Sequence, residues 1–346
     1  MTYEQLPIEE VFKTADLLEP MGKDYKRTIQ IPQNAVMTGI TPIDEALQGI
    51  MPNDFVVAGA ATGAGKTALS CKIGATAALA GNKVTLFALE AYDGEISDRI
   101  KFPRLAQKWW EKYKEPLIYK RWKRGYYNFQ GLPEIEEEVI AETPKELMEN
   151  LHVRYRTNSE YSVDDFLREI KCFASMGKPD LIIVDHLHYF SLPDDISENK
   201  ATKKIVNALR DYGLLEEIPI VLFAHMRKKH MGVKTLVPSI DEFHGSSEIT
   251  KNATVVLTFA PAYGVEMPTQ HQFPTYMQVV KDRFNGSIKR YAMMTSFDIR
   301  KSDYDKDYRL FTVKNDGAEM DLVEDSRIPD WAEHAKRSGF QGRYGK

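Results

Sequence analysis

The chain has few cysteines and no long hydrophobic run. Its 346 residues include two cysteines, Cys71 and Cys172, which excludes a disulfide framework and fits a reducing compartment. Residues 1–20 are acidic and lack the apolar stretch of a signal peptide. Nowhere does the sequence approach the roughly 20 apolar residues that a membrane-spanning helix needs. These absences predict a soluble, cytoplasmic protein with no membrane partner.

A large excess of positive charge is also missing. The chain carries 46 Lys and Arg against 50 Asp and Glu, a net charge of -4. The whole molecule therefore does not attract nucleic acid, and any basic surface must be local. The hydrophobic content of 43% and the charged content of 28% are those of a globular protein with a substantial core.

Five short apolar segments alternate with helical patterns along the middle of the chain. They cover residues 55–60, 83–89, 180–185, 219–225 and 254–260. Their nearly continuous apolar character is typical of parallel strands that are buried on both faces. Since strands and helices alternate, the sequence predicts an α/β fold with a mostly parallel central sheet and helices on both faces.

The pattern changes after the last of these strands. The segments MQVVKDRF and IKRYAMMTSF flank Asn285-Gly286, a strong hairpin signal. We therefore expect an antiparallel hairpin appended to the parallel sheet. We expect residues 1–35 to form an arm, 36–317 the folded domain, and 318–346 a polar, partly flexible tail.

Residues 99–150 are expected to form an insertion with separated charge. Residues 99–124 hold ten Lys and Arg against two Glu, interleaved with aromatic residues, and residues 134–149 hold seven Glu against one Lys. The basic, aromatic half could stack bases and contact phosphates. It could equally bind a partner protein or its own acidic half.

The segment VVAGAATGAGKT, residues 56–67, has the context of a phosphate-binding loop, because a predicted strand precedes it and a predicted helix follows it. Backbone N–H groups and the helix N-terminus would hold the phosphates of ATP. Lys66 would contact the β- and γ-phosphates, and Thr67 would bind Mg²⁺. The strict motif has glycine at position 60, but Ala60 can serve if its φ is negative. The predicted phosphate-binding residues are Ala61, Thr62, Gly63, Ala64, Gly65, Lys66, Thr67 and Ala68.

Three further residues end predicted strands, where parallel strands place functional groups. Asp185 closes LIIVD and would bind the Mg²⁺ ion with Thr67. Glu90 follows VTLFAL and could polarise the attacking water, although it could also be an ordinary glutamate at a helix start. His225 closes PIVLFAH and could sense the γ-phosphate, or it could be a satisfied histidine at the sheet edge.

Lys281 and Arg283 lie two residues apart on the strand before Asn285-Gly286, so they share a face of that strand. Two cations near a hairpin tip are poorly suited to a core. They could reach the γ-phosphate of a neighbouring subunit. The alternative is a solvated strand face.

These motifs, in this order, resemble the ATPase domain of DnaB-type replicative helicases, which are RecA-like ring motors. The resemblance rests on TGITPIDEALQGIMPNDFVVAGAATGAGKTAL, VTLFALE, LIIVDHLH, PIVLFAHMRK and KDRFNG, and it covers roughly residues 37–300. The family's loop tolerates alanine at the position of Ala60. The resemblance implies that Glu90 acts in hydrolysis, that Lys281 and Arg283 act in trans, and that the protein is a homohexamer.

The chain departs from the family pattern at several points. His188 and His225 stand where the family usually has glutamine. No arginine occurs in DEFHGSSEI, residues 241–249, where the family's DNA-facing loop carries one. Only a short arm precedes the motor in this sequence, so we expect the helical domain that contacts primase in the family to be absent.

In such a ring, the loops after the third and fourth strands face the central channel. Here these two loops are residues 191–204 and 226–249. The second loop could track the phosphates of single-stranded DNA, or it could be a solvated loop. Its candidate residues are Arg227, Lys228, Lys229, Lys234 and His244.

Three functions are consistent with the sequence. The first is an ATP-driven, homohexameric DNA helicase or translocase on single-stranded DNA. The second is a RecA-like ATPase that regulates or remodels protein partners without unwinding DNA. The third is a nucleotide-binding assembly module that does not catalyse hydrolysis, which would require Glu90 or Asp185 to be irrelevant.

Overall fold

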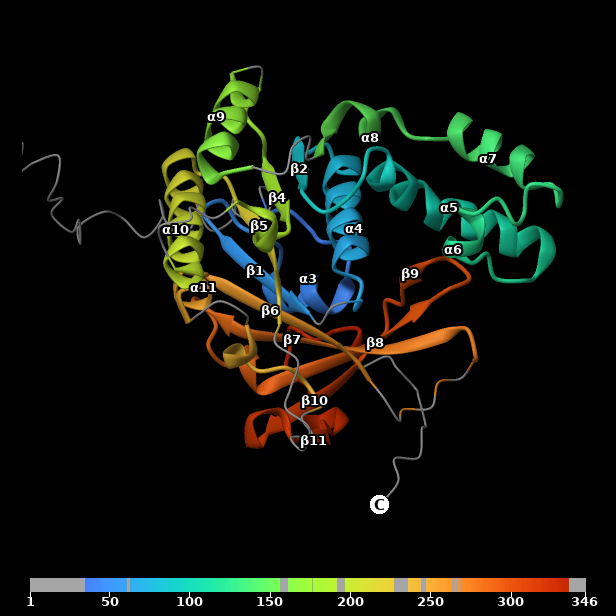
Figure 1. The fold of residues 1–346 in the computed structure, drawn as a ribbon. Helices are drawn as coiled ribbons and strands as arrows, with labels where there is room; N and C mark the ends of the chain where they lie inside the picture. Colours follow the sequence, from blue (N-terminus) through green and yellow to red (C-terminus); the bar gives the residue numbers. More distant parts are fainter. Residues whose placement is uncertain are drawn as a thin grey trace, which may run out of the picture.

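The computed structural model describes residues 35–60, 63–155, 161–175, 177–191, 197–226, 236–243, 247–262, 265, 267 and 269–335. Their centre is one eleven-stranded sheet (Figure 1). Its parallel part comprises β1 (Phe55–Ala60), β2 (Val84–Ala88), β3 (Leu151–Tyr155), β4 (Leu181–Asp185), β5 (Ile220–His225) and β6 (Val255–Pro261). Its antiparallel part comprises β7 (Gln272–Asp282), β8 (Tyr291–Asp298), β9 (Asp303–Tyr304), β10 (Arg309–Lys314) and β11 (Glu319–Leu322).

The strand order is β11-β10-β8-β7-β6-β1-β5-β4-β2-β3, with β9 paired to β8. The predicted α/β class with a mostly parallel sheet is confirmed. The five expected strands appear as β1, β2, β4, β5 and β6, each within one residue of its expected ends. Strand β3 was not expected; it forms the outer edge of the sheet beside β2.

Helices cover both faces of the parallel strands (Figure 1). Helices α3 (Thr41–Leu47) and α4 (Lys66–Leu79) pack on one face, where they meet alternate strand residues such as Val56 and Ala58. Helices α9 (Val163–Ala174), α10 (Glu198–Glu216) and α11 (Ser247–Asn252) pack on the other face, against residues such as Val57. No helix in the described part of the chain combines the length and the apolar character that crossing a bilayer requires.

The antiparallel hairpin forms as expected, but not through a two-residue turn at Asn285-Gly286. Strands β7 and β8 pair antiparallel, and residues 283–290 connect them through a short 3₁₀ turn, Ile288–Arg290. Gly286 is not among the glycines with positive φ, which both central positions of a type I′ turn require. The connection is therefore a longer loop.

The C-terminal segment extends the sheet beyond the expected domain boundary at residue 317. Strand β11 pairs with β10, so this boundary falls inside a hairpin. Further along, Ala332 and Ala335 are buried in the same core as α3 and α4. Residues 319–335 thus pack on the domain, and the remaining residues of the expected tail lie outside the described part.

Residues 95–142, here called the helical module, lie to the side of the sheet beyond α4 (Figure 1). The module contains α5 (Glu95–Tyr113), α6 (Tyr119–Trp122) and α7 (Leu132–Ala141), and α8 (Lys145–Asn150) leads from it into β3. The module has a core of its own, which includes Phe102, Trp109, Tyr127 and Val139. The expected insertion therefore has a core of its own, in which aromatic and aliphatic side chains pack together.

The basic and acidic halves of the helical module contact each other. The Lys108 ammonium lies 3.1 Å from a carboxylate oxygen of Glu138 and 2.8 Å from one of Glu142. The indole N–H of Trp122 donates to Glu136. Of the three alternatives left open by the sequence, pairing between the two halves is the one observed in these contacts.

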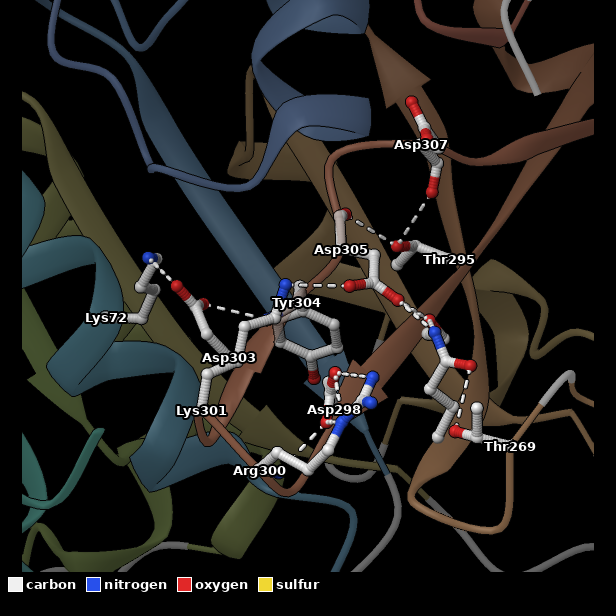
Figure 2. Close-up of polar contacts among 12 residues, drawn as sticks. Lys72, Thr269, Thr295, Asp298, Arg300, Lys301, Asp303, Tyr304, Asp305 and Asp307 are labelled. Carbon is white, nitrogen blue, oxygen red and sulfur yellow. Dashed lines mark hydrogen bonds and ion pairs between the residues drawn. The ribbon is translucent and has the colours of Figure 1, made fainter. Parts of the chain in front are cut away.

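A polar network fixes the β8–β9 hairpin against α4 (Figure 2). The Lys72 ammonium of α4 lies 2.7 Å from the Asp303 carboxylate, and Lys301 pairs with Asp305 at the same distance. Arg300 is held by Asp298 and also lies over the Trp110 ring of α5, 5.6 Å from its centroid. The hairpin therefore connects the helical module to the helix that follows the phosphate loop.

The core of the helical module can be tested with two aromatic truncations. Trp109 is 2% exposed, whereas Phe129 is fully exposed. Trp109→Ala should lower the free energy of unfolding by about 3–5 kcal/mol, because it leaves a large cavity. Phe129→Ala should change it by less than about 0.5 kcal/mol. Guanidinium denaturation followed by circular dichroism measures both, and equal effects would contradict the assigned core.

Candidate active site

The carboxyl ends of the central strands meet at one edge of the sheet. Ala60 at the end of β1 is paired with His225 at the end of β5, and Ala88 of β2 is paired with Asp185 at the end of β4. Four strand ends and the start of α4 therefore converge. This edge is where open parallel sheets bind ligands.

In the described part of the predicted phosphate loop, two glycines adopt the left-handed backbone conformation that other residues rarely take. Gly63 and Gly65 have φ values of 81° and 90°. A Cβ at either position would meet nothing within 4 Å, so the backbone conformation, not crowding, favours glycine there. Ala60 continues β1 in regular register with both neighbours and is not among the positive-φ residues. Alanine at position 60 thus causes no strain. Ala61 and Thr62 lie outside the described residues.

Lys66 begins α4 and is buried at the convergence of the strands. It is 7% exposed, and its ammonium donates a hydrogen bond of 3.2 Å to the Ala60 carbonyl. Burial lowers the pKa of Lys66, while the charges of Asp185 and Glu90 act in the opposite direction. The two nearby carboxylates favour the charged form of Lys66, which is the form that contacts a phosphate.

Asp185 is the most deeply buried acid of this edge, at 2% exposure. The Ser70 hydroxyl donates to its Oδ2 at 3.0 Å, and the Thr67 hydroxyl also hydrogen bonds to it. Burial raises the pKa of Asp185, and these two hydrogen bonds partly offset the rise. Its Oδ1 has no hydrogen-bond partner within the described ranges.

This arrangement fits a hard cation such as Mg²⁺. Mg²⁺ prefers oxygen ligands and is usually bound by one or two carboxylates together with substrate phosphates. The unpartnered Oδ1 of Asp185 and the Thr67 hydroxyl beside it are such ligands. Thr67 and Asp185 are therefore the residues that would hold the ion.

Glu90 lies two residues beyond β2, at the rim of the same edge. Its side chain is 47% exposed, and its Oε2 lies 3.1 Å from Nε2 of His186. It contributes electrostatically to both Lys66 and Asp185, so it faces the same space. A carboxylate in this position can contact water, as a general base must.

Three histidines cluster beside Glu90. The ring centroids of His186 and His225 are 4.1 Å apart, and His188 lies 5.6 Å from His186 and 5.3 Å from His225. Burial, followed by the nearby His225 and His188, lowers the pKa of His186 to about 3. Within the described residues, no group of three or more His, Cys, Asp or Glu side chains is arranged to hold a metal ion.

Lys281 and Arg283 lie at the opposite edge of the sheet. Lys281 pairs with Val256 and Asp282 with Val255, the first residues of β6, whereas Ala60 pairs with Phe259 further along. At 3.3 Å per residue, the offset along the strands is about 10 Å for Lys281 and about 13 Å for Asp282, and Arg283 lies one residue further. The two cations thus lie far from the phosphate loop of their own chain.

The two cations differ in their surroundings. The Lys281 ammonium donates to the carbonyls of Thr250 at 2.8 Å and Lys251 at 3.1 Å, near the end of α11. Burial and the nearby Arg283 lower the pKa of Lys281. Arg283 is exposed. The expected pair therefore consists of one anchored ammonium and one accessible guanidinium.

The candidate DNA-contacting residues Arg227, Lys228, Lys229, Lys234 and His244 all lie outside the described residues. In the helical module, Trp109 and Phe102 are buried in its core and are not open to stacking. Tyr126 and Phe129 remain exposed, and Arg121 lies over the Tyr126 ring.

Two residues of this edge were missed by sequence reasoning. Ser70 lies one helical turn after Lys66 and Thr67, and this spacing could have indicated a contact with the residue that ends β4. His186 follows Asp185 directly, but only the folded structure shows that its ring meets Glu90.

Strand β1 leads into a glycine-bearing loop, and the helix that follows opens with Lys-Thr beside a buried aspartate that ends a parallel strand. This arrangement defines the class of phosphate-loop ATPases. The sequence matches the family model "DnaB-like helicase C terminal domain" over residues 35–303. The chain therefore belongs to the DnaB-like helicase family, as the motifs predicted.

Solved structures of low sequence identity share the fold. A DnaB-like replicative helicase, studied with its interactions with primase, superposes with a TM-score of 0.66 at 15% identity, covering 84% of this chain and 67% of that chain. A second solved structure, which is an ATPase domain, superposes with a TM-score of 0.67 at 15% identity, covering 84% of this chain and 98% of that domain. No curated protein sequence matches the chain.

The Ser70 contact gives a test of the metal site. Ser70→Ala removes the hydroxyl that holds Oδ2 of Asp185. Loss of a group that orients a metal ligand typically weakens metal affinity about 10- to 100-fold. We expect a corresponding rise in the Mg²⁺ concentration that supports half-maximal ATP hydrolysis. Ser287→Ala, in the exposed β7–β8 loop, is the matched control, and an unchanged Mg²⁺ requirement in Ser70→Ala would contradict the assignment.

Proposed function

We propose that the chain is an ATP-hydrolysing motor that moves along single-stranded DNA as a homohexamer. The observation that carries this proposal is the division of one expected site between two edges of the sheet. Lys66, Thr67, Asp185 and Glu90 converge at the carboxyl edge. The cations that should complete the site lie at the other edge, where a second copy of the chain is needed to bring them to it.

Each residue at the carboxyl edge has a role in this proposal. The loop amides and Lys66 bind the phosphates of ATP, and Thr67 and Asp185 hold Mg²⁺. When bound, Mg²⁺ supplies charge neutralisation at the phosphate oxygens. Glu90 orients the attacking water and accepts its proton. His225, beside His186, contacts the γ-phosphate as a sensor.

Lys281 and Arg283 act on the site of the neighbouring copy in this proposal. Lys281 is fixed against the carbonyls of α11, so it can position the segment that carries Arg283. The exposed Arg283 then stabilises the charge that develops on the transferred phosphoryl group. Hydrolysis at each interface moves the loops after β4 and β5, which contact the DNA.

The competing function is an ATPase that remodels protein partners. Its support is the exposed end of the helical module, where Tyr126 and Phe129 are open to a partner. The two functions differ in their response to single-stranded DNA.

ATP turnover with and without a single-stranded oligonucleotide separates these functions. We expect turnover to rise with the oligonucleotide, and its binding to weaken with salt by a log–log slope of about -0.7 for each neutralised phosphate. Double-stranded DNA without a single-stranded tail is the control. A flat response without salt-dependent binding would exclude the translocase and favour the protein-remodelling ATPase.

Mixing two inactive variants tests the shared site. Lys66→Ala removes the phosphate contact, and Arg283→Ala removes the proposed contact from the next copy, so each variant alone should be nearly inactive. A mixture forms some interfaces with an intact Lys66 on one side and an intact Arg283 on the other. For random mixing of independent sites, about a quarter of the interfaces are complete, and ATP turnover should recover accordingly. If subunits exchange, as shown with labelled protein, and no activity returns, Arg283 does not act in trans.

A further inference from the structure

A third cation lies at the edge of the sheet that carries Lys281 and Arg283. Nη1 of Arg210, a residue of α10, donates a hydrogen bond of 2.6 Å to the carbonyl of Asn53, two residues before β1 begins. This contact fixes the guanidinium at the amino end of β1. A fixed guanidinium with further N–H groups can bind an anion.

A chain of hydrogen bonds places Arg210 beside Arg283. The Arg283 N–H donates to the Thr254 carbonyl at 2.9 Å, and the Thr254 hydroxyl donates to the Asp54 carboxylate at 2.7 Å. Asp54 adjoins Asn53, the residue that holds Arg210. The two arginines are therefore tied to neighbouring positions at the starts of β1 and β6. In agreement with this placement, burial, followed by the charge of Arg283, lowers the pKa of Arg210.

Neither guanidinium is paired with a carboxylate. Among the residues that the structure describes, no Asp or Glu forms an ion pair with Arg210 or Arg283. Asp54 lies near, but its two oxygens accept hydrogen bonds from the Thr254 hydroxyl and the Met51 N–H. Two like charges held close together repel each other, and an anion bound between them removes this repulsion.

Lys281 is less available to such an anion than the two arginines. Its ammonium already donates to the carbonyls of Thr250 and Lys251. Within the described ranges the Arg210 guanidinium makes a hydrogen bond through Nη1 alone, so its other N–H groups remain available. The planar fork of arginine also matches phosphate oxygens with two parallel hydrogen bonds, which an ammonium cannot do.

We propose that Arg210 acts together with Arg283 on the phosphates of the ATP that the neighbouring copy binds. The inference rests on the proposed shared site and deepens it by adding a guanidinium from a second element, α10. One chain then supplies two guanidinium groups to the oxygens of one triphosphate. Because Arg210 is already anchored, binding orders little of its side chain, which limits the entropic cost.

Single substitutions measure the contribution of the charge. Arg210→Ala should lower kcat/KM for ATP about 10- to 100-fold, the effect of losing a hydrogen bond to a charged group. Arg210→Lys should regain part of this loss, because it keeps the charge but not the planar fork. Arg168→Ala, which removes an exposed arginine of α9, is the matched control and should behave as wild type.

Mixing experiments show whether Arg210 acts on its own copy or on the next. In an equal mixture of Arg210→Ala and Lys66→Ala, about a quarter of the interfaces combine an intact Lys66 with an intact Arg210. Turnover should then rise above the mean of the two variants alone. In a mixture of Arg210→Ala and Arg283→Ala, every interface lacks one of the two guanidinium groups, so turnover should stay at that mean.

A role confined to its own chain, such as holding Asn53, predicts no gain in the first mixture although labelled subunits exchange, and that result would overturn the proposal. Wild-type turnover of Arg210→Ala, or a gain in the second mixture, would also overturn it. Thermal unfolding checks that each variant folds. If Arg210→Ala does not fold, Arg210→Gln replaces it in both mixtures, because it keeps an amide donor without the charge.

The Arg283 variant separates this inference from the proposed function. If Arg283→Ala keeps wild-type turnover, the proposed shared site fails, and the role of Arg210 fails with it. If Lys66→Ala gains activity when mixed with Arg283→Ala but not when mixed with Arg210→Ala, the shared site stands and the role of Arg210 alone fails.

Discussion

The burial of two opposite charges at one edge of the sheet is the constraint on which the rest of the site depends. Lys66 and Asp185 are each less than a tenth exposed, and a buried charge is costly unless it is paired and hydrogen bonded. The Ala60 carbonyl and the hydroxyls of Ser70 and Thr67 meet this need in part. Oδ1 of Asp185 has no such partner among the described residues, and a cation would bind at this oxygen.

The direction of the strands determines where the other functional groups lie. Because β1, β2, β4 and β5 are parallel, their carboxyl ends bring Lys66, Glu90, Asp185 and His225 together from four separate segments. Strand β7 runs antiparallel to β6, so its end carries Lys281 to the opposite edge. Under the proposed function, one chain thus presents two complementary parts of a site at opposite edges, and a head-to-tail arrangement of copies would join them.

Local sequence patterns predicted the features that depend on residues near one another in the chain. The buried strands follow from apolar runs, and Asp185 follows from its place after such a run. Strand β3 was missed, because LHVRY at residues 151–155 is half-exposed and lacks that run. Strand β11 was missed because it is only four residues long, mostly exposed, and carries two acidic residues. The burial of Trp109 and the orientation of His186 depend on contacts between distant segments, which no spacing along the chain reveals.

The mass of the assembly in the presence of Mg²⁺ and ATP tests the central claim most directly. Sedimentation velocity of the Glu90→Gln variant, whose slow hydrolysis should preserve the ATP-bound state, measures it without turnover. The account predicts a closed oligomer, a hexamer, under these conditions. A protein that binds ATP and stays strictly monomeric would contradict a site completed between copies.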